Sequence, residues 1–266
     1  MSGEGEKPAP PALDPPWRNF YGRRHGKRLK PSQRAHLERL LPLLRVPGAG
    51  RAENPGRLPV DLAALFGRPG PVWLEIGFGA GEHLAAQARA HPHIGMIGCE
   101  PFVNGVATLL GRLAAAVPGA DPGADRGNVR LHPGDARDLL DVLPPASLAR
   151  VFLLYPDPWP KSRHRRRRFV SAENLAALAR VMAPGAELRL ATDIADYAGH
   201  AATALAASGF FAPIAAAPPG WHRPWPGWQG TRYEAKALRE GRAPHYLTLR
   251  REAAAGLPVD RAGRRA

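Results

Sequence analysis

The chain has 266 residues, of which 44% are hydrophobic and 23% are charged, a composition typical of one packed domain of roughly 200 residues with tails. Its single cysteine, Cys99, excludes an intramolecular disulfide framework and a multi-cysteine zinc site. The ten histidines show no metal-ligand spacing, so we expect no metal. The opening residues do not resemble a signal peptide, and no run of about 18 apolar residues occurs. We therefore expect a cytoplasmic protein with no membrane segment.

The formal net charge of +14 is concentrated in three segments. Residues 1–35 carry +5, residues 161–168 carry +6 and residues 250–266 carry +3, so the rest of the chain is neutral. Concentrated basic patches are typical of proteins that bind a polyanion, because each neutralised phosphate releases counterions. The alternative is a compositional bias, since only five of the 37 basic residues are lysine.

Three parts follow one another along the chain. Residues 1–35, which include the proline-rich stretch 8–16, predict a flexible, basic N-terminal arm. Residues 36–250 predict one domain, which opens with a short helical segment. Residues 251–266 predict a basic C-terminal tail.

Short apolar runs alternate with longer helical patterns from residue 71 onward, as βα units on a parallel sheet do. The predicted strands are 72–76, 94–99, 129–132, 150–154 and 187–191, with a last pair near 210–216 and 245–250. The predicted helices are 81–90, 102–115, 171–182 and 196–207. The sequence thus predicts an α/β fold, a mostly parallel sheet with helices on both faces. Ligands of such sheets lie beyond the carboxyl ends of the strands, so we expect functional residues there.

A glycine-rich turn follows the first predicted strand. It contains Gly77, Gly79 and Gly81, and Glu75 stands two residues before the first glycine. Glycine permits positive φ and lets the backbone approach a ligand closely. The spacing G-x-G-x-G differs from the G-x-G-x-x-G of dinucleotide enzymes, and with the nearby carboxylate it favours a cationic, nucleoside-bearing ligand. A plain tight turn is the alternative.

Two further acids follow the second and third predicted strands. Glu100 stands where a carboxylate can accept both ribose hydroxyls of an adenosine. Asp135 is placed where it could meet the adenine amino group. Each acid taken alone is as compatible with a helix cap as with a ligand contact. Three acids at three successive strand ends, behind a glycine turn, favour S-adenosyl-L-methionine.

The fourth predicted strand runs into the proline-stiffened turn 155–161, which holds Asp157 beside the expected methyl donor. The cationic run that follows, up to residue 168, can engage phosphates and steer a polynucleotide into the site. A solvated helix face is the alternative. However, six cations at a helix start oppose the macrodipole, which favours an external anion.

These motifs together resemble the tRNA (guanine-N7-)-methyltransferase family, the bacterial single-chain enzymes that modify guanine in the tRNA variable loop. The resemblance rests on the run PDPWPKSRHRRRR after the glycine turn, on Thr192, Asp193 and Tyr197, and on residues 231–234 with Lys236. It covers about residues 70–250. It implies a Rossmann-like, S-adenosyl-L-methionine-dependent methyltransferase that acts on tRNA.

The resemblance also implies roles for individual residues. Asp157 is the implied catalytic residue. The implied contacts of S-adenosyl-L-methionine are Glu75, Gly77, Gly79, Gly81, Glu100, Asp135 and Asp157. The implied substrate contacts are Lys161, Asp193, Thr231, Arg232, Tyr233 and Glu234, and the implied RNA contacts are Arg163, His164, Arg165, Arg166, Arg167 and Arg168. Ser162–Arg163 departs from the pattern, where a second lysine is common.

Attack by guanine N7 on a sulfonium methyl requires no prior proton removal, so positioning is the main task. We hypothesise that Asp157 holds the guanine edge and offsets the positive charge that develops on the purine, while Lys161 anchors a phosphate or the base carbonyl. Asp193 and Glu234 would accept from the guanine N1–H and amino group.

Several alternatives stay open at this point. Three indoles in residues 218–228 predict either a base-stacking platform or a hydrophobic lid over the sheet. The chain could instead methylate an exocyclic base amine of RNA or DNA, or bind RNA without catalysis. Whether it acts as a monomer or a homodimer is not determined.

Overall fold

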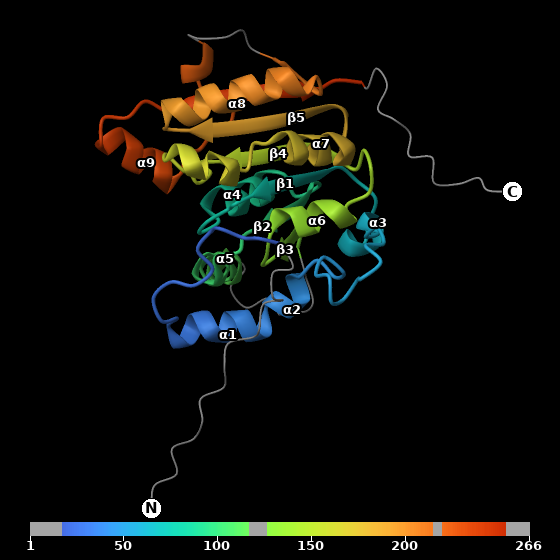
Figure 1. The fold of residues 1–266 in the computed structure, drawn as a ribbon. Helices are drawn as coiled ribbons and strands as arrows, with labels where there is room; N and C mark the ends of the chain where they lie inside the picture. The colour runs from blue at the N-terminus through green and yellow to red at the C-terminus, as the bar shows by residue number, and fades with distance from the viewer. Residues whose placement is uncertain (1–17, 117–126, 215–219, 254–266) are drawn as a thin grey trace, which may run out of the picture.

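The computed structural model describes residues 18–116, 127–214 and 220–253. Its centre is a seven-stranded sheet in the order β3-β2-β1-β4-β5-β7-β6 (Figure 1). The strands are β1 (Val72–Ile76), β2 (Gly95–Cys99), β3 (Val129–His132), β4 (Leu148–Leu154), β5 (Met182–Thr192), β6 (Phe211–Pro213) and β7 (His245–Arg251). Strands β1 to β5 are parallel, and β7 runs antiparallel between β5 and β6. The strand order reverses between β1 and β4, where doubly wound sheets bind ligands.

Helices cover both faces of the sheet. The α-helices are α1 (Pro31–Arg39), α2 (Leu41–Leu44), α3 (Leu62–Phe66), α4 (Glu82–Ala90), α5 (Val103–Ala116), α6 (Ala136–Val142), α7 (Ala172–Val181), α8 (Ala195–Ser208) and α9 (Arg232–Arg239), and the 3-10 helices are η1 (Ser162–Arg167) and η2 (Gly220–His222). Helices α6, α7 and α8 pack on one face, and α4 and α5 pack on the other. The predicted fold class is confirmed.

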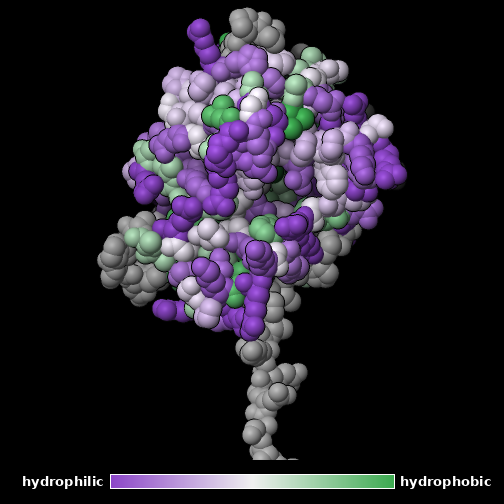
Figure 2. All heavy atoms as spheres, turned by 90° about the vertical axis from the view of Figure 1, so that its left-hand side faces the viewer, coloured by the Kyte–Doolittle hydropathy of each residue, from purple (hydrophilic) through white to green (hydrophobic). Residues whose placement is uncertain are grey.

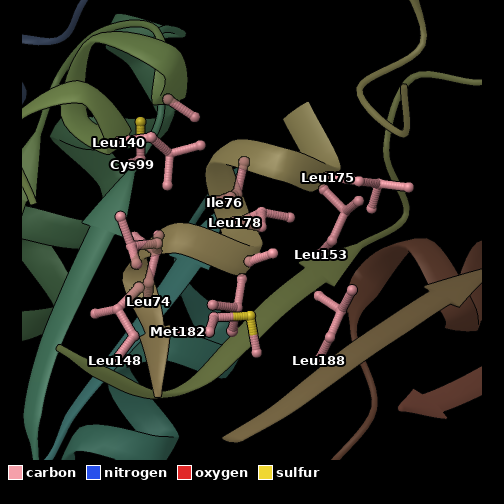
Figure 3. Close-up of a cluster of buried hydrophobic side chains, with 14 of the residues drawn as sticks. Leu74, Ile76, Cys99, Leu140, Leu148, Leu153, Leu175, Leu178, Met182 and Leu188 are labelled. Atoms are coloured by element: carbon pink, nitrogen blue, oxygen red, sulfur yellow. The ribbon is translucent and has the colours of Figure 1, made fainter. Parts of the chain in front are cut away.

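The side chains of each strand alternate between two buried clusters. In β1, Leu74 joins the cluster under α6, α7 and α8, whereas Trp73 joins the cluster under α4 and α5. In β4, Leu153 and Phe152 divide in the same way. Figure 3 shows Leu74 and Leu153 within the first cluster. Because both faces are covered, the inner strands are mostly apolar, as in parallel sheets generally, and Glu75 in β1 and Arg150 in β4 are exceptions.

The predicted strands match β1 and β3, and β2, β4 and β5 differ only in their limits. The structure adds α6 and α9, which the periodicity did not predict. Both follow a side-chain cap: Asp135 accepts from the Arg137 N–H, and Thr231 accepts from the Glu234 N–H. With seven and eight residues, these helices are too short for an apolar period to stand out.

The prediction that the arginine run begins a helix is wrong. The run forms the separate 3-10 helix η1, and α7 begins only at Ala172, after the Ser171 cap. Its cations therefore do not face the macrodipole of α7, and that part of the argument for an external anion no longer applies.

The N-terminal segment lies along the domain over the part that the structure describes. The Val103 N–H donates to the Arg24 carbonyl, and the Asn104 side chain bonds the backbones of Gly26 and Lys27 at 2.8 and 2.7 Å. Helix α1 then packs against α5. Over residues 18–35 the predicted arm therefore contacts the domain, and its flexibility stays a prediction. Residues 1–17 and 254–266 lie outside the described residues, and residue 251 of the expected tail belongs to β7.

Candidate functional site

A cavity of about 530 Å³ opens at the carboxyl ends of the strands, near the point where the strand order reverses. Its size suits a nucleoside-sized ligand. The predicted site residues that line it are Gly77, Gly79, Glu100, Asp135, Asp157, Arg166, Arg167, Arg168 and Tyr233. Figure 2 views the molecule from the side on which these strands end, and hydrophilic side chains surround a hollow there.

The glycine turn holds its backbone against neighbouring elements. Gly77 and Gly79 have φ of +74° and +58°, which side chains rarely adopt, and the Gly77 N–H donates to the Cys99 carbonyl at 2.8 Å. The carbonyl of Gly79 lies so near α5 that a Cβ on Gly105 would approach it to 2.2 Å. The loop therefore presents its backbone directly to the cavity.

Glu100 is held by the glycine turn itself. Its two carboxylate oxygens accept from the N–H groups of Gly79 at 2.7 Å and Phe102 at 2.8 Å. Burial raises the pKa of this carboxyl to about 7, against the two backbone hydrogen bonds that lower it. Each carboxylate oxygen retains a second lone pair, so the side chain can still accept from a vicinal diol.

Asp135 lines the cavity but already has a partner. Arg137 binds its carboxylate through both Nε, at 3.0 Å, and Nη2, and also donates to the Asn19 carbonyl at 2.8 Å. In the predicted contact with adenine, the Asp135 carboxylate oxygens would have to accept from the adenine amino group and from Arg137 together.

Glu75 does not line the cavity. It lies buried on β1 and pairs with the buried His83 of α4, at 2.7 Å from Oε2 to Nδ1. Its direct contact with the ligand stays a prediction. The pair ties the strand before the glycine turn to the helix after it.

Asp157 projects into the cavity from the turn after β4. Desolvation there raises the pKa of its carboxyl above the ordinary value. Among the described residues, none donates a hydrogen bond to it. Tyr155 and Trp159, on either side, have φ of +49° and +42°, and such strain in residues with a Cβ is typical of functional turns.

Helix α9 brings Tyr233 over the glycine turn. A Cβ on Gly79 would lie 3.2 Å from the Tyr233 hydroxyl, and the Tyr233 ring stacks with Tyr155 at 6.3 Å between centroids. Arg232, predicted to contact substrate, instead pairs with Glu82 at the start of α4, which also binds Arg112 at 3.0 Å. This ion-pair cluster joins α9 to the glycine turn.

The other predicted substrate acids also have intramolecular partners. Glu234 accepts from the Trp228 indole N–H at 2.6 Å and from the Tyr246 hydroxyl. Asp193 accepts from Arg242 at 2.6 Å. Neither acid lines the cavity, and neither does Thr231 or Lys161. These residues therefore lie outside the lining of this cavity, after β4 and β5 and at the start of α9.

The tryptophan-rich segment covers the sheet. Trp225 is only 6% exposed and packs edge-on against Tyr246, and Trp221 packs against the core. Trp228 is half-buried and is bonded to Glu234. For these indoles the structure favours the lid over the stacking platform, and residues 218–219 lie outside the described part.

The arginine run is not uniform. The Arg168 side chain is fully buried, donates to the Pro158 carbonyl at 2.9 Å and pairs with Asp196, which contradicts the prediction that it faces RNA. Arg165 also pairs with Asp196. Arg163 and Arg166 are exposed and, within the part that the structure describes, pair with no acid. Desolvation, together with the surrounding cations, lowers the pKa of His164.

Sequence reasoning missed the contribution of the N-terminal segment. Residues 19–23 line the cavity, and Arg167 lies between the rings of Tyr21 and Trp159, at 4.4 and 5.0 Å from their centroids. The aromatic pair Phe20–Tyr21 within a basic stretch is the only signal that could have indicated it.

Comparison with known proteins identifies the relatives of this chain. A family model described as "Putative methyltransferase" matches residues 69–247. The tRNA (guanine-N(7)-)-methyltransferase of Paracoccus denitrificans is 56% identical over 238 residues, covering 90% of this chain and 97% of the relative. That of Ruegeria pomeroyi is 57% identical over 239 residues, covering 90% and 96%.

The chain belongs to the tRNA (guanine-N(7)-)-methyltransferase family. Another relative of that name, from Nitrobacter hamburgensis, is 49% identical over 236 residues, covering 88% of this chain and 87% of the relative. The resemblance seen in the glycine turn and in the turn around Asp157 is thereby confirmed at the level of the family.

Two features are absent from the described residues. No helix among them is long and apolar enough to cross a membrane. They contain no group of three or more His, Cys, Asp or Glu side chains arranged to hold a metal ion.

Proposed function

We propose that this chain transfers the methyl group of S-adenosyl-L-methionine to N7 of a guanine in the variable loop of tRNA. The observation that carries the proposal is the position of Asp157, an unpaired carboxylate in a cavity that is bounded on one side by the glycine turn and on the other by the arginine run. The names of the relatives supply the base and the class of RNA.

The cavity fits the methyl donor. Gly77 and Gly79 let the backbone close on a ligand, and Glu100 is oriented by two N–H groups so that it can accept from the ribose hydroxyls. The carboxylates of Glu100 and Asp157 on the cavity wall suit the cationic part of the donor. Asp135 is paired with Arg137, and further arginines also line the wall. When bound, the donor supplies a methyl group activated on a sulfonium.

Asp157 stabilises charge on the guanine and does not remove a proton from it. N7 already carries a lone pair, and positive charge develops on the purine as the new bond forms. A carboxylate fixed by a proline-stiffened turn stabilises that charge without reorganisation. Its raised pKa shows the cost of desolvation, and a cationic base beside it would favour the ionised form.

The exposed cations of η1 would bind the RNA backbone next to the cavity. Arg163, Arg166 and Lys161, the residue before η1, are exposed and form no ion pair with any described residue, so they can neutralise phosphates. Arg167 holds the cavity wall. Asp193 and Glu234 would accept from the guanine edge. We place this reaction in the cytoplasm, with the tRNA pool.

No observation on the described residues favours methylation of an exocyclic amine, and the intact cavity speaks against a purely RNA-binding protein. The experiment that tests the proposal uses the full chain, unmodified tRNA and S-adenosyl-L-methionine, with nucleoside mass spectrometry after digestion. We expect 7-methylguanosine, which should disappear with Asp157→Ala and with tRNA whose variable-loop guanine is replaced by adenine. A methylated exocyclic amine, or donor binding without methylation of any tRNA, would contradict it.

A further inference from the structure

Asp193 and Arg242 form an ion pair beyond the carboxyl end of β5, at the same edge of the sheet as the cavity. Asp193 follows β5, and Arg242 follows α9, 49 residues later in the chain. The Arg242 Nε donates to Oδ2 of Asp193 at 2.6 Å. The Asp193 side chain is 15% exposed and that of Arg242 is 37% exposed. The contact therefore fixes a mostly buried acid rather than two freely solvated chains.

Arg242 is itself well anchored. Its backbone N–H donates to the Ala237 carbonyl at 2.9 Å, just after Gly241, whose φ of +72° turns the chain out of α9. Its Nη1 also pairs with Glu240. The guanidinium is thus held from the side of α9, and Asp193 is oriented by an element other than its own.

The hydrogen bond takes one oxygen of the carboxylate. Within the described residues, Oδ1 of Asp193 accepts from no other side chain. A carboxylate oxygen only accepts hydrogen bonds, so Oδ1 is available to a donor that approaches from outside. Guanine presents the donors N1–H and N2–H on its Watson–Crick edge, and adenine does not present that pair.

We infer that Arg242 is a positioning residue for guanine selection, which acts by orienting Asp193. The inference rests on the proposed function, since it assigns Asp193 to the guanine edge. Arg242 would not touch the reacting atoms, and its loss would weaken recognition of tRNA while leaving the methyl donor site intact. The rival explanation is that Arg242 itself binds a phosphate of the RNA.

A double-mutant cycle separates these explanations, because residues that act through one another are not additive. The variants are Asp193→Asn, Arg242→Met and the double substitution. Arg239→Met serves as the matched control, since Arg239 is an exposed cation in the last turn of α9 and forms no ion pair with any described residue. Kinetics with tRNA are measured for each, together with calorimetric affinity for the donor and thermal unfolding.

We expect Arg242→Met to raise KM for tRNA about tenfold, with donor affinity and kcat close to those of the unaltered chain. Added to Asp193→Asn, it should cause no further loss. Arg239→Met should change KM by less than about twofold. Arg242→Lys should recover only part of the loss, because lysine keeps the charge but not the fork geometry.

Multiplicative losses in the double variant would overturn the inference, because Arg242 would then act on RNA independently of Asp193. An unchanged KM for Arg242→Met in a folded protein would overturn it as well. Absence of 7-methylguanosine with the unaltered chain would instead overturn the proposed function, and the inference with it.

Discussion

The two sides of the cavity hold their acids in different ways. On the methyl-donor side, Glu100 is 7% exposed and is oriented by two backbone N–H groups, that of Phe102 and that of Gly79 in the glycine turn. On the guanine side, Asp193 and Glu234 are oriented by the side chains of Arg242, Trp228 and Tyr246, which come from other elements. Between the two sides, Asp157 has no partner in the described structure.

This difference separates a rigid half from an assembled half. Backbone donors in a glycine turn are fixed by the fold, so the donor side is formed before any ligand arrives. Side-chain partners on the guanine side depend on the docking of α9 and of the tryptophan segment. We therefore expect changes on the first side to affect donor affinity, and changes on the second side to affect recognition of RNA.

The largest effect is expected at the boundary between the two sides. Asp157→Asn keeps the shape of the side chain but removes its charge, so it should lower kcat by about 10²- to 10³-fold, with little change in donor affinity. Single-turnover methylation at saturating tRNA measures this directly. Turnover near that of the unaltered chain would refute the electrostatic role.

On the donor side, Glu100→Gln should weaken donor binding about tenfold or more, because one carboxylate acceptor is lost where two N–H groups and a diol converge. Isothermal calorimetry with the donor measures the affinity. If Glu100→Gln weakened tRNA binding by that factor and left the affinity for the donor unchanged, Glu100 would belong to the RNA side of the cavity.

The raised pKa of Glu100 predicts that the affinity for the donor depends on pH. Burial raises its pKa from 4.5 to about 7, so ionisation of Glu100 costs folding free energy as the pH rises through that window. Ligand hydroxyls favour the ionised form, so donor affinity should rise from pH 5.5 to about pH 7.5, with proton release in calorimetry. Glu100→Gln should remove both the slope and the proton release.

On the RNA side, the arginine run should divide into two kinds of residue. Arg163→Ala with Arg166→Ala should weaken tRNA binding and make the salt dependence less steep by about one unit per arginine. Arg168→Met should instead lower the free energy of unfolding by roughly 1–3 kcal/mol. The reason is that the Arg168 side chain is buried and bonded to Pro158 and Asp196. Filter binding at several salt concentrations and thermal unfolding distinguish the two.

The smallest effect is expected at the Glu82–Arg232 contact. Arg232 is half exposed, so Arg232→Ala should change the free energy of unfolding by less than about 1 kcal/mol. It should nevertheless raise KM modestly, because α9 carries Tyr233 over the glycine turn. The exchange Glu82→Arg with Arg232→Glu should restore KM, and failure to do so would remove the positioning role of this contact.

Local patterns in the sequence determined much of this protein. The apolar runs predicted the parallel strands, because both faces of the sheet are buried, and the glycines and acids after the strands marked the binding edge. The turn around Asp157 indicated the family without any structure. In each case the physical signal lies within a few consecutive residues, so it can be read along the chain.

Only the tertiary structure decided which charged residues are free. Arg168 and Arg163 look alike in the run, yet one is buried on Asp196 and the other is exposed. Arg232 meets Glu82 across 150 residues of chain, and Glu75 of β1 meets His83 of α4. Such partners are chosen by how the helices dock on the sheet, and no local pattern carries that information.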